Sequence, residues 1–322
     1  MKINMPQAVK EIIATLQQNN YEAYAVGGCV RDSILGREPN DWDITTSASP
    51  EEVKALFRRT IDTGIEHGTV TIMIDKVGYE VTTYRIDGKY EDGRHPTEVT
   101  FTRNLKEDLL RRDFTINAMA YNDTDGLGDI FGGLEDIERK VIRCVGDPRA
   151  RFTEDALRLM RAVRFAAQLG YTIEEETREA MKEIAGNLSK ISAERIQVEL
   201  VKTLVSPNPF MMKDAYELGL TKYFMPEFDL AMETEQHNRH HMYTVGEHSL
   251  VATGHIRADK VLRLTMLMHD FGKPLCITTD EEGIDHYYGH PAKSEEIARE
   301  ILHRLKFDND TIRKVCILVR HH

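Results

Sequence analysis

Two aspartates separated by one residue, Asp41 and Asp43, are the residues of this sequence best suited to metal chemistry. We predict that both lie on one strand, where alternate side chains point to the same face and would bring two carboxylates side by side. Such a pair could hold two Mg²⁺ ions, which would activate an attacking hydroxyl and stabilise a leaving pyrophosphate. The pair alone is also typical of a solvated strand end, so its neighbours must decide between these interpretations.

A Gly-Gly pair precedes the aspartates, between a predicted strand at residues 21–26 and a predicted helix. A glycine turn that leads into a helix leaves backbone N–H groups free to bind phosphate. Gly27 and Gly28 are therefore candidate triphosphate ligands, with Arg31 at the start of the helix. Glu80, on a further predicted strand, is a candidate third metal ligand, although an exposed strand glutamate is an equally good interpretation.

Residues 143–164 contain six arginines against three acidic residues, in a chain whose formal net charge is -11. The negative net charge of the whole chain argues against indiscriminate nucleic-acid binding, but this segment could bind RNA or triphosphate locally. A helix over residues 154–166 would place Glu154, Arg158 and Arg161 on one polar face. For an isolated helix with this spacing, surface ion pairs are the simpler interpretation.

The surrounding elements are expected to alternate between helix and strand in the first part of the chain and to be helical afterwards. Residues 5–18 have the spacing of an amphipathic helix, and residues 69–85 have that of a hairpin that turns at residues 75–78. Ser49 and Glu52 form a capping-box pattern, so a helix begins there.

A second group of residues suited to metal binding lies near the C-terminus. His269-Asp270 follows an apolar helical pattern, with His248 upstream and His290 downstream. Neutral imidazoles and a carboxylate suit Mn, Ni, Fe or Mg, whereas a lone histidine on an apolar helix is usually structural. The pattern resembles the HD superfamily of metal-dependent phosphohydrolases. This part of the chain is rich in histidine, which also favours metal binding. The nine histidines between residues 236 and 303 are His237, His240, His241, His248, His255, His269, His286, His290 and His303.

The resemblance to the HD superfamily also implies a late aspartate on a final helix, and none follows the terminal VRHH. The last helix carries no Gly or Pro stop signal. We therefore expect a truncated chain with an incomplete phosphohydrolase site.

Four motifs, in order, resemble those of the class II CCA-adding enzymes and bacterial poly(A) polymerases. They are GGCVRD with DWDI, RRDFTINAMAY at residues 111–121, EDALRLMRAVRFA at residues 154–166 and SAER at residues 192–195, with a glycine-rich DIFGGLEDI between the second and third. The match spans about residues 20–205. It implies an α+β fold, in which a nucleotidyltransferase head of the polymerase β type is followed by a helical neck.

The resemblance assigns Arg112, Asp113 and Asn117 to the sugar and triphosphate of the nucleotide. It also implies that Glu154, Asp155 and Arg158, rather than a nucleic-acid template, select the incoming base; Arg161 and Arg164 are further nucleotide-binding candidates. Asp155 could accept a hydrogen bond from the exocyclic amine of cytosine or adenine, while Arg158 donates to the ring. Uracil or guanine in the same place would leave a buried polar group without a hydrogen-bond partner, which would cost roughly 1 to 3 kcal/mol of binding free energy.

The polar stretch from Arg85 to Arg94 is expected to form a mobile loop over the cleft. Similar loops in the resembled family are associated with adding the terminal A. Its presence therefore favours full CCA addition over CC-only addition.

Together with these patterns, the resemblance implies a transferase that adds C, C and A to the tRNA 3′ end from CTP and ATP with two Mg²⁺ ions. The alternatives are a poly(A) polymerase and an HD phosphohydrolase with an inactive head. We expect no protein partner. The sequence has no run of the ~18–20 apolar residues that a membrane helix needs and no signal-peptide core, which favours the cytoplasm. The predicted domains are a head (1–137), a neck (138–205), a connector (206–235) and an HD-type metal-binding domain (236–322).

Overall fold

The computed structural model describes residues 1–88, 99–236 and 243–322. His237, His240, His241 and most of the polar stretch at 85–94 lie outside the described residues. The chain divides into two compact units, residues 1–154 and 155–322. The predicted boundaries at 137, 205 and 235 are finer than this division and stay predictions.

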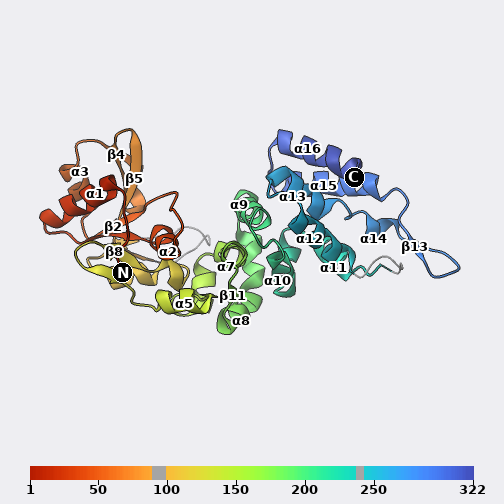
Figure 1. Cartoon of the computed structure of the whole chain (residues 1–322), viewed down its shortest axis with the longest axis horizontal. Coiled ribbons are helices and arrows are strands. Elements are labelled where there is room, and N and C mark those ends of the chain that lie inside the picture. The colour runs from red at the N-terminus through yellow and green to blue at the C-terminus, as the bar shows by residue number, and fades with distance from the viewer. Residues whose placement is uncertain (89–98, 237–242) are drawn as a thin grey trace. The chain divides into compact units, whose positions relative to one another are not determined.

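The first unit is built on a seven-stranded mixed sheet (Figure 1). Strands β2 and β5 are parallel, and the other neighbouring pairs are antiparallel. The combination of this sheet with helices confirms the predicted mixture of α and β structure. In sheet order the strands are β3 (Thr60–Gly64), β4 (Thr69–Ile74), β5 (Val77–Thr83), β2 (Ile44–Thr46), β1 (Ala23–Val26), β8 (Ala120–Asn122) and β9 (Gly126–Gly128).

Helices and a small second sheet complete this unit. Helix α1 packs against β1 and buries Val9, Ile12, Ile13 and Leu16, as its amphipathic spacing predicts. The second sheet pairs β6 (Arg85–Asp87) with β7 (Val99–Phe101). The helices of the unit are α1 (Gln7–Gln18), α2 (Gly28–Ile34), α3 (Pro50–Leu56), α4 (Leu105–Leu110), α5 (Gly133–Arg139) and α6 (Pro148–Glu154).

Two local predictions in this unit are confirmed. Helix α3 begins with a complete capping box, in which Ser49 and Glu52 each bind the other's backbone N–H. Strands β4 and β5 form the predicted hairpin, with Ile74 opposite Val77. The two turn residues, Asp75 and Lys76, both have positive φ, which is the primed turn that matches the twist of a hairpin.

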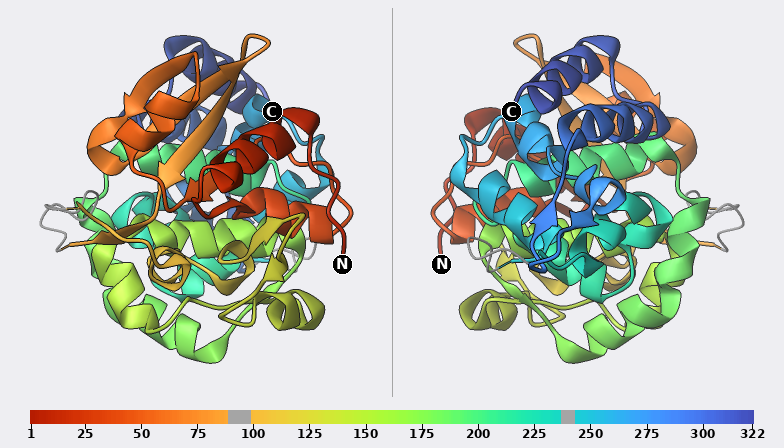
Figure 2. Two further views of the ribbon diagram at one scale, coloured as in Figure 1. Left: turned by 90° about the vertical axis from the view of Figure 1, so that its left-hand side faces the viewer. Right: turned by 90° about the vertical axis from the view of Figure 1, so that its right-hand side faces the viewer.

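The second unit is helical apart from short strands. Helices α7, α9 and α10 pack on one another, and further along the chain α13 packs against both α12 and α16, with α15 beside α16 (Figure 1, Figure 2). Residues 206–209 separate α9 from α10. The helices are α7 (Leu157–Leu169), α8 (Glu175–Ile184), α9 (Ala193–Leu204), α10 (Met211–Glu217), α11 (Pro226–Glu233), α12 (Val245–His255), α13 (Lys260–Met268), α14 (Lys273–Cys276), α15 (His290–Arg304) and α16 (Asn309–Arg320).

The prediction of one continuous helix over residues 154–166 is wrong. Helix α6 ends at Glu154 and α7 begins at Leu157. The Leu157 N–H donates to Oδ1 of Asp155 at 3.0 Å. A short acidic side chain that binds the backbone two residues on competes with helical hydrogen bonding, so Asp155 interrupts the helix. Glu154 therefore does not share a helical face with Arg158 and Arg161.

No helix within the described ranges is both long and apolar enough to cross a bilayer.

Candidate active site

The two aspartates lie just before a strand rather than within one. Strand β2 begins at Ile44, so the expectation that Asp41 and Asp43 share a regular strand is wrong. The backbone is nevertheless paired at Asp43, whose carbonyl accepts from the Val26 N–H at 3.0 Å. Both aspartates are exposed. Surrounding protein raises the pKa of Asp43 by removing water, the guanidinium of Arg112 opposes this, and the charge of Asp41 raises it further.

Glu80 lies level with Asp43 on the neighbouring strand. Ile44 of β2 pairs with Val81 of the parallel strand β5, which places the preceding residues beside one another. Asp41, Asp43 and Glu80 line one cavity of about 670 Å³. Its other lining residues are Asn4, Pro6, Glu38, Pro39, Asn40, Trp42, Val77, Gly78 and Tyr79.

The donor set around this cavity fits a hard divalent cation, because carboxylate oxygens are the ligands that Mg²⁺ prefers. The raised pKa of Asp43 reflects, in part, the neighbouring charge of Asp41, which a bound cation would offset. The three carboxylates surround the cavity without forming a close ligand set. Among the described residues, the groups whose ligand atoms all lie within 4.8 Å of one another belong to the second unit.

The Gly-Gly turn leaves space for an arginine. Gly27 has φ +84°, in the left-handed region that favours glycine, and Nη1 of Arg112 lies 3.4 Å from the position that a Cβ would occupy there. Any other residue at this position would therefore have a strained backbone, and its Cβ would contact Arg112. Helix α2 starts at Gly28, directly after the turn.

Three predicted nucleotide-binding residues bind one another beside this turn. Arg31 Nη1 donates to Asn117 Oδ1 at 2.6 Å, and Asn117 Nδ2 donates to Asp113 Oδ1 at 3.1 Å. All three side chains are buried. Arg31 also lies close to Gly28, with Nη2 3.5 Å from the position of a Cβ there. The three residues thus support the turn from within the protein.

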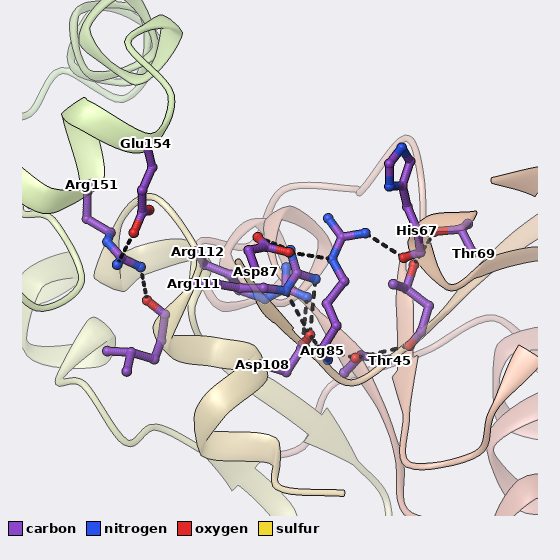
Figure 3. A network of polar contacts seen from close by, with 12 residues as sticks. Thr45, His67, Thr69, Arg85, Asp87, Asp108, Arg111, Arg112, Arg151 and Glu154 are labelled. Atoms are coloured by element: carbon purple, nitrogen blue, oxygen red, sulfur yellow. Dashed lines mark hydrogen bonds and ion pairs between the residues drawn. The ribbon is translucent and has the colours of Figure 1, made fainter. Parts of the chain in front are cut away.

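Glu154 is tied to the segment that carries Arg112 (Figure 3). Arg151 donates through Nη1 to the Leu110 carbonyl at 2.6 Å and through Nη2 to Glu154 Oε1 at 2.5 Å. The end of α6 is thereby fixed to the end of α4, immediately before Arg111 and Arg112.

In the second unit, both carboxylate oxygens of Asp155 are fixed. Oδ1 accepts from the Leu157 N–H, and Oδ2 accepts from Nη2 of Arg195 at 2.7 Å. Arg195 belongs to the SAER motif quoted above, yet the sequence alone did not show what it binds. The carboxylate is therefore held in one orientation.

The arginines of α7 differ in their surroundings. Arg158 and Arg161 are half-buried, and the guanidinium of Arg161 lies 5.3 Å from the centre of the Phe165 ring. Arg164 is buried, pairs with Glu199 at 2.5 Å and stacks on the same ring at 4.0 Å. Its charge is thus matched inside the unit, and a nucleotide contact from Arg164 stays a prediction.

Four histidines of the second unit surround Asp270. The Nε2 atoms of His248 and His269 lie 3.5 and 3.2 Å from Asp270 Oδ2, while those of His290 and His322 lie 3.3 and 3.6 Å from Oδ1. Two sets of possible metal ligands therefore share this carboxylate: His248, His269 and Asp270, and Asp270, His290 and His322.

Backbone carbonyls orient three of these imidazoles. The Nδ1 atoms of His269, His290 and His322 each lie 2.7 Å from a carbonyl oxygen three residues earlier. A hydrogen bond from Nδ1–H leaves the lone pair of Nε2 available to a metal, which is the usual outer support of a histidine ligand. The sequence did not identify His322, because only the packing of α16 against α13 brings this residue to Asp270.

Lys273 also contacts Asp270. Its Nζ lies 2.8 Å from Asp270 Oδ2 and 3.1 Å from Gln236 Oε1. Burial alone raises the pKa of Asp270, but hydrogen bonding from His269 and the charge of Lys273 outweigh it and lower this pKa well below its usual value. Asp270 is therefore held as a carboxylate, which is the form that binds metal.

Comparison with known proteins places these sites in a family context. Residues 23–143 match the family described as "Poly A polymerase head domain". Residues 170–232 match "Probable RNA and SrmB- binding site of polymerase A". The first match contains both aspartates, Glu80 and Arg112, and the second begins after α7.

Relatives and solved structures agree with these matches. The chain is 56% identical over 203 residues to the CCA-adding enzyme of Lactiplantibacillus plantarum and 53% identical over 223 residues to that of Levilactobacillus brevis. These matches cover 63% and 69% of the chain but 50% and 56% of the relatives, so the chain spans about half the length of the curated relatives it matches. The crystal structure of the Bacillus stearothermophilus CCA-adding enzyme in complex with CTP is 34% identical, with a TM-score of 0.71 over 97% of this chain and 69% of that one. The chain therefore belongs to the family of CCA-adding enzymes.

Proposed function

We propose that this chain transfers nucleotides to the 3′ end of tRNA, adding C, C and A from CTP and ATP without a nucleic-acid template. The observation that carries the proposal is the arrangement of the first unit, where three carboxylates line one cavity and Arg112 lies against the Gly27 turn. The names of the relatives and the CTP in the Bacillus stearothermophilus structure support the choice of substrates.

Each group of the first unit has a distinct task in this proposal. Asp41 and Asp43, with Glu80, would hold two Mg²⁺ ions, which activate the attacking hydroxyl and stabilise the leaving pyrophosphate when bound. Arg112 binds triphosphate oxygens through a planar guanidinium. The Gly27 turn lets the triphosphate approach the backbone closely, and Arg31, Asp113 and Asn117 keep the turn in place.

Selection of the base is assigned to Asp155 and Arg158 of the second unit. Asp155 accepts from the exocyclic amine of cytosine or adenine, and Leu157 and Arg195 hold its carboxylate in the orientation for doing so. A rigid acceptor discriminates better than a mobile one, because it cannot turn away from the carbonyl of uracil or guanine.

Location in the cytoplasm stays a prediction from the sequence.

A tRNA that ends at its discriminator base tests the proposal when it is incubated with CTP, ATP or both. We expect two C additions with CTP alone and a complete CCA end with both. Asp41→Asn and Asp43→Asn should each lower transfer by about 1,000-fold or more, because the metal site is lost. Asp62→Asn, which changes an exposed acid of the same unit that pairs with Lys54, is the matched control and should transfer normally.

The match to a poly(A) polymerase head makes poly(A) the alternative product. If the assay gives repeated addition of A without any C, the proposed function changes from CCA addition to poly(A) synthesis. Full transfer by Asp43→Asn would contradict the assigned metal site for either product.

We also propose that the histidine cluster of the second unit binds divalent metal; hydrolysis of phosphate esters is the chemistry that the resemblance to the HD superfamily implies for such a site. The observation that favours it is the pair of ligand sets that share Asp270, with three imidazoles oriented by backbone carbonyls. Metal content after dialysis against Mn²⁺ or Ni²⁺, together with hydrolysis of bis(p-nitrophenyl) phosphate, tests this function. Asp270→Asn should remove both properties, whereas His303→Ala, at an exposed histidine of α15, should change neither. Metal bound equally by the Asp270→Asn protein would refute the site.

A further inference from the structure

Asp108 is a fully buried carboxylate at the centre of a polar network in the first unit (Figure 3). It belongs to α4, and its side chain is 0% exposed. Burying an ionised carboxylate costs free energy unless cations and hydrogen bonds compensate for the lost water. The partners of this residue therefore indicate what the network is built to hold.

The two oxygens of Asp108 bind different parts of the unit. Oδ2 accepts from Nη2 of Arg112 at 3.3 Å and from Oγ1 of Thr45 at 3.1 Å. Oδ1 accepts from Nε of Arg111 at 3.0 Å and from the backbone N–H of Arg85 at 3.4 Å. One carboxylate thus joins the two adjacent arginines to β2 and β6.

The bond to Thr45 relates Arg112 to the metal-binding aspartates. Thr45 lies on β2, two residues after Asp43. A shift of β2 relative to Arg112 would have to break a hydrogen bond at the same oxygen that binds the guanidinium. Asp108 therefore fixes the separation between the strand that follows Asp43 and the arginine assigned to the triphosphate.

The nitrogens of the Arg112 guanidinium have different surroundings. Asp108 binds Nη2 from the protein interior, while Nη1 lies against Gly27 and Nε is buried without a hydrogen-bond partner among the described residues.

We propose that Asp108 is a positioning residue for nucleotide transfer, which acts by holding the Arg112 guanidinium at the Gly27 turn. This role rests on the proposed transfer function, and it extends that function to a residue that does not itself touch the nucleotide. A merely structural Asp108 would affect stability but would have no specific dependence on Arg112.

A double-mutant cycle distinguishes a positioning role of Asp108 from a purely structural one. Asp108→Asn keeps the size of the side chain and removes its charge, and Arg112→Met removes the guanidinium. We expect Asp108→Asn to weaken binding of Mg·CTP roughly 10- to 100-fold when Arg112 is present, the range for loss of a hydrogen bond to a charged group. In the Arg112→Met protein the same change should alter CTP binding by less than about twofold, because its partner is gone.

Isothermal titration with Mg·CTP measures the cycle, and thermal unfolding reports stability on the same samples. Equal fold-changes in both backgrounds, or unchanged binding in the Asp108→Asn protein, would overturn the positioning role. Thr45→Val has a similar volume and removes the bond to the same oxygen together with a bond to the Thr82 carbonyl at 3.3 Å, and it replaces Asp108→Asn in the cycle if that variant does not fold. A smaller loss of affinity that again disappears with Arg112→Met supports the proposal, and an additive or absent effect refutes it.

The same titration distinguishes this proposal from the transfer function on which it rests. If the wild-type protein binds CTP but transfers no nucleotide to tRNA, only the transfer function is overturned. The double-mutant cycle can still be carried out, because it measures CTP binding. A wild-type protein that binds no nucleoside triphosphate overturns both.

Discussion

At the scale of single residues, Asp155 illustrates how one side chain can interrupt a helix and be held in one orientation at the same time. It ends the helical path after Glu154 by binding the Leu157 N–H, and its other oxygen binds Arg195. The interrupted helix is thus the means by which the carboxylate is oriented.

Removing Arg195 should relax base selection. In Arg195→Met, Asp155 loses the partner of Oδ2, so the preference for CTP and ATP over UTP and GTP should fall by roughly 10-fold, below the effect of Asp155→Ala. Single-turnover incorporation of each of the four triphosphates measures this preference. Arg178→Met, which breaks the ion pair with Asp214 in the same unit, is the control and should keep selectivity. Selectivity in Arg195→Met equal to that of the wild type would show that Arg195 does not position Asp155.

The buried pair of Arg164 and Glu199 makes a prediction about stability. Arg164→Met alone should lower the free energy of unfolding by about 3 to 5 kcal/mol, because Glu199 is left buried without its cation. The double change, Arg164→Met with Glu199→Leu, should lower the free energy of unfolding much less. Urea denaturation provides the values. If the single change instead leaves stability intact and weakens CTP binding, Arg164 contacts nucleotide as the sequence predicts.

At the scale of elements, the segments whose form depends on adjacent residues were predicted well. The capping box of α3 and the β4–β5 hairpin follow from local backbone hydrogen bonds and turn geometry, both of which are encoded within a few residues. The strand at Asp41 and the single helix over residues 154–166 were wrong. In the second case the Asp155 carboxylate accepts a hydrogen bond from the Leu157 N–H, which competes with helical hydrogen bonding.

The hairpin turn leads to a simple test of this local encoding. Lys76 has φ 67°, which costs a non-glycine residue free energy, whereas Asp-Gly is a favoured sequence for a primed two-residue turn. Lys76→Gly should therefore raise the free energy of unfolding by about 0.5 to 1 kcal/mol. Denaturant unfolding measures the change, with Lys10→Gly in α1 as a control that should be destabilised. A loss of stability in Lys76→Gly would contradict the assigned turn.

At the scale of the whole molecule, Asp108 makes stability depend on pH. Burial raises its pKa, but the charges of Arg112 and Arg111 outweigh this, and the folded protein holds the pKa below the ordinary value of 3.8. A lowered folded pKa contributes stability that is complete above the unfolded pKa and is lost as the pH falls through the folded one. The contribution of Asp108 should thus be constant near neutral pH and disappear in acid.

The difference in unfolding free energy between the wild type and Asp108→Asn measures this contribution. We expect the difference to be constant from pH 5 to 7 and to shrink progressively below about pH 4, which denaturant titrations at each pH can follow. A difference that grows as the pH falls would mean that the folded pKa of Asp108 is raised.

The sequence by itself determined the family, the order of motifs and the elements whose form depends on neighbouring residues. It placed Asp41, Asp43 and His269 among the candidates because their types and local spacing suit metal binding, and the resemblance to the CCA-adding enzymes added Arg112 and Asp155. Those properties are carried by a few consecutive residues and need no knowledge of packing.

Only the tertiary structure decided which distant residues become partners. Thr45 reaches Asp108 across 63 positions, and Arg195 reaches Asp155 across 40. Arg164 is matched by Glu199, and His322 arrives at Asp270 through the packing of α16 on α13. Such pairings depend on how helices and strands pack, because the free energy of burying a charge is set by whatever group the fold brings beside it.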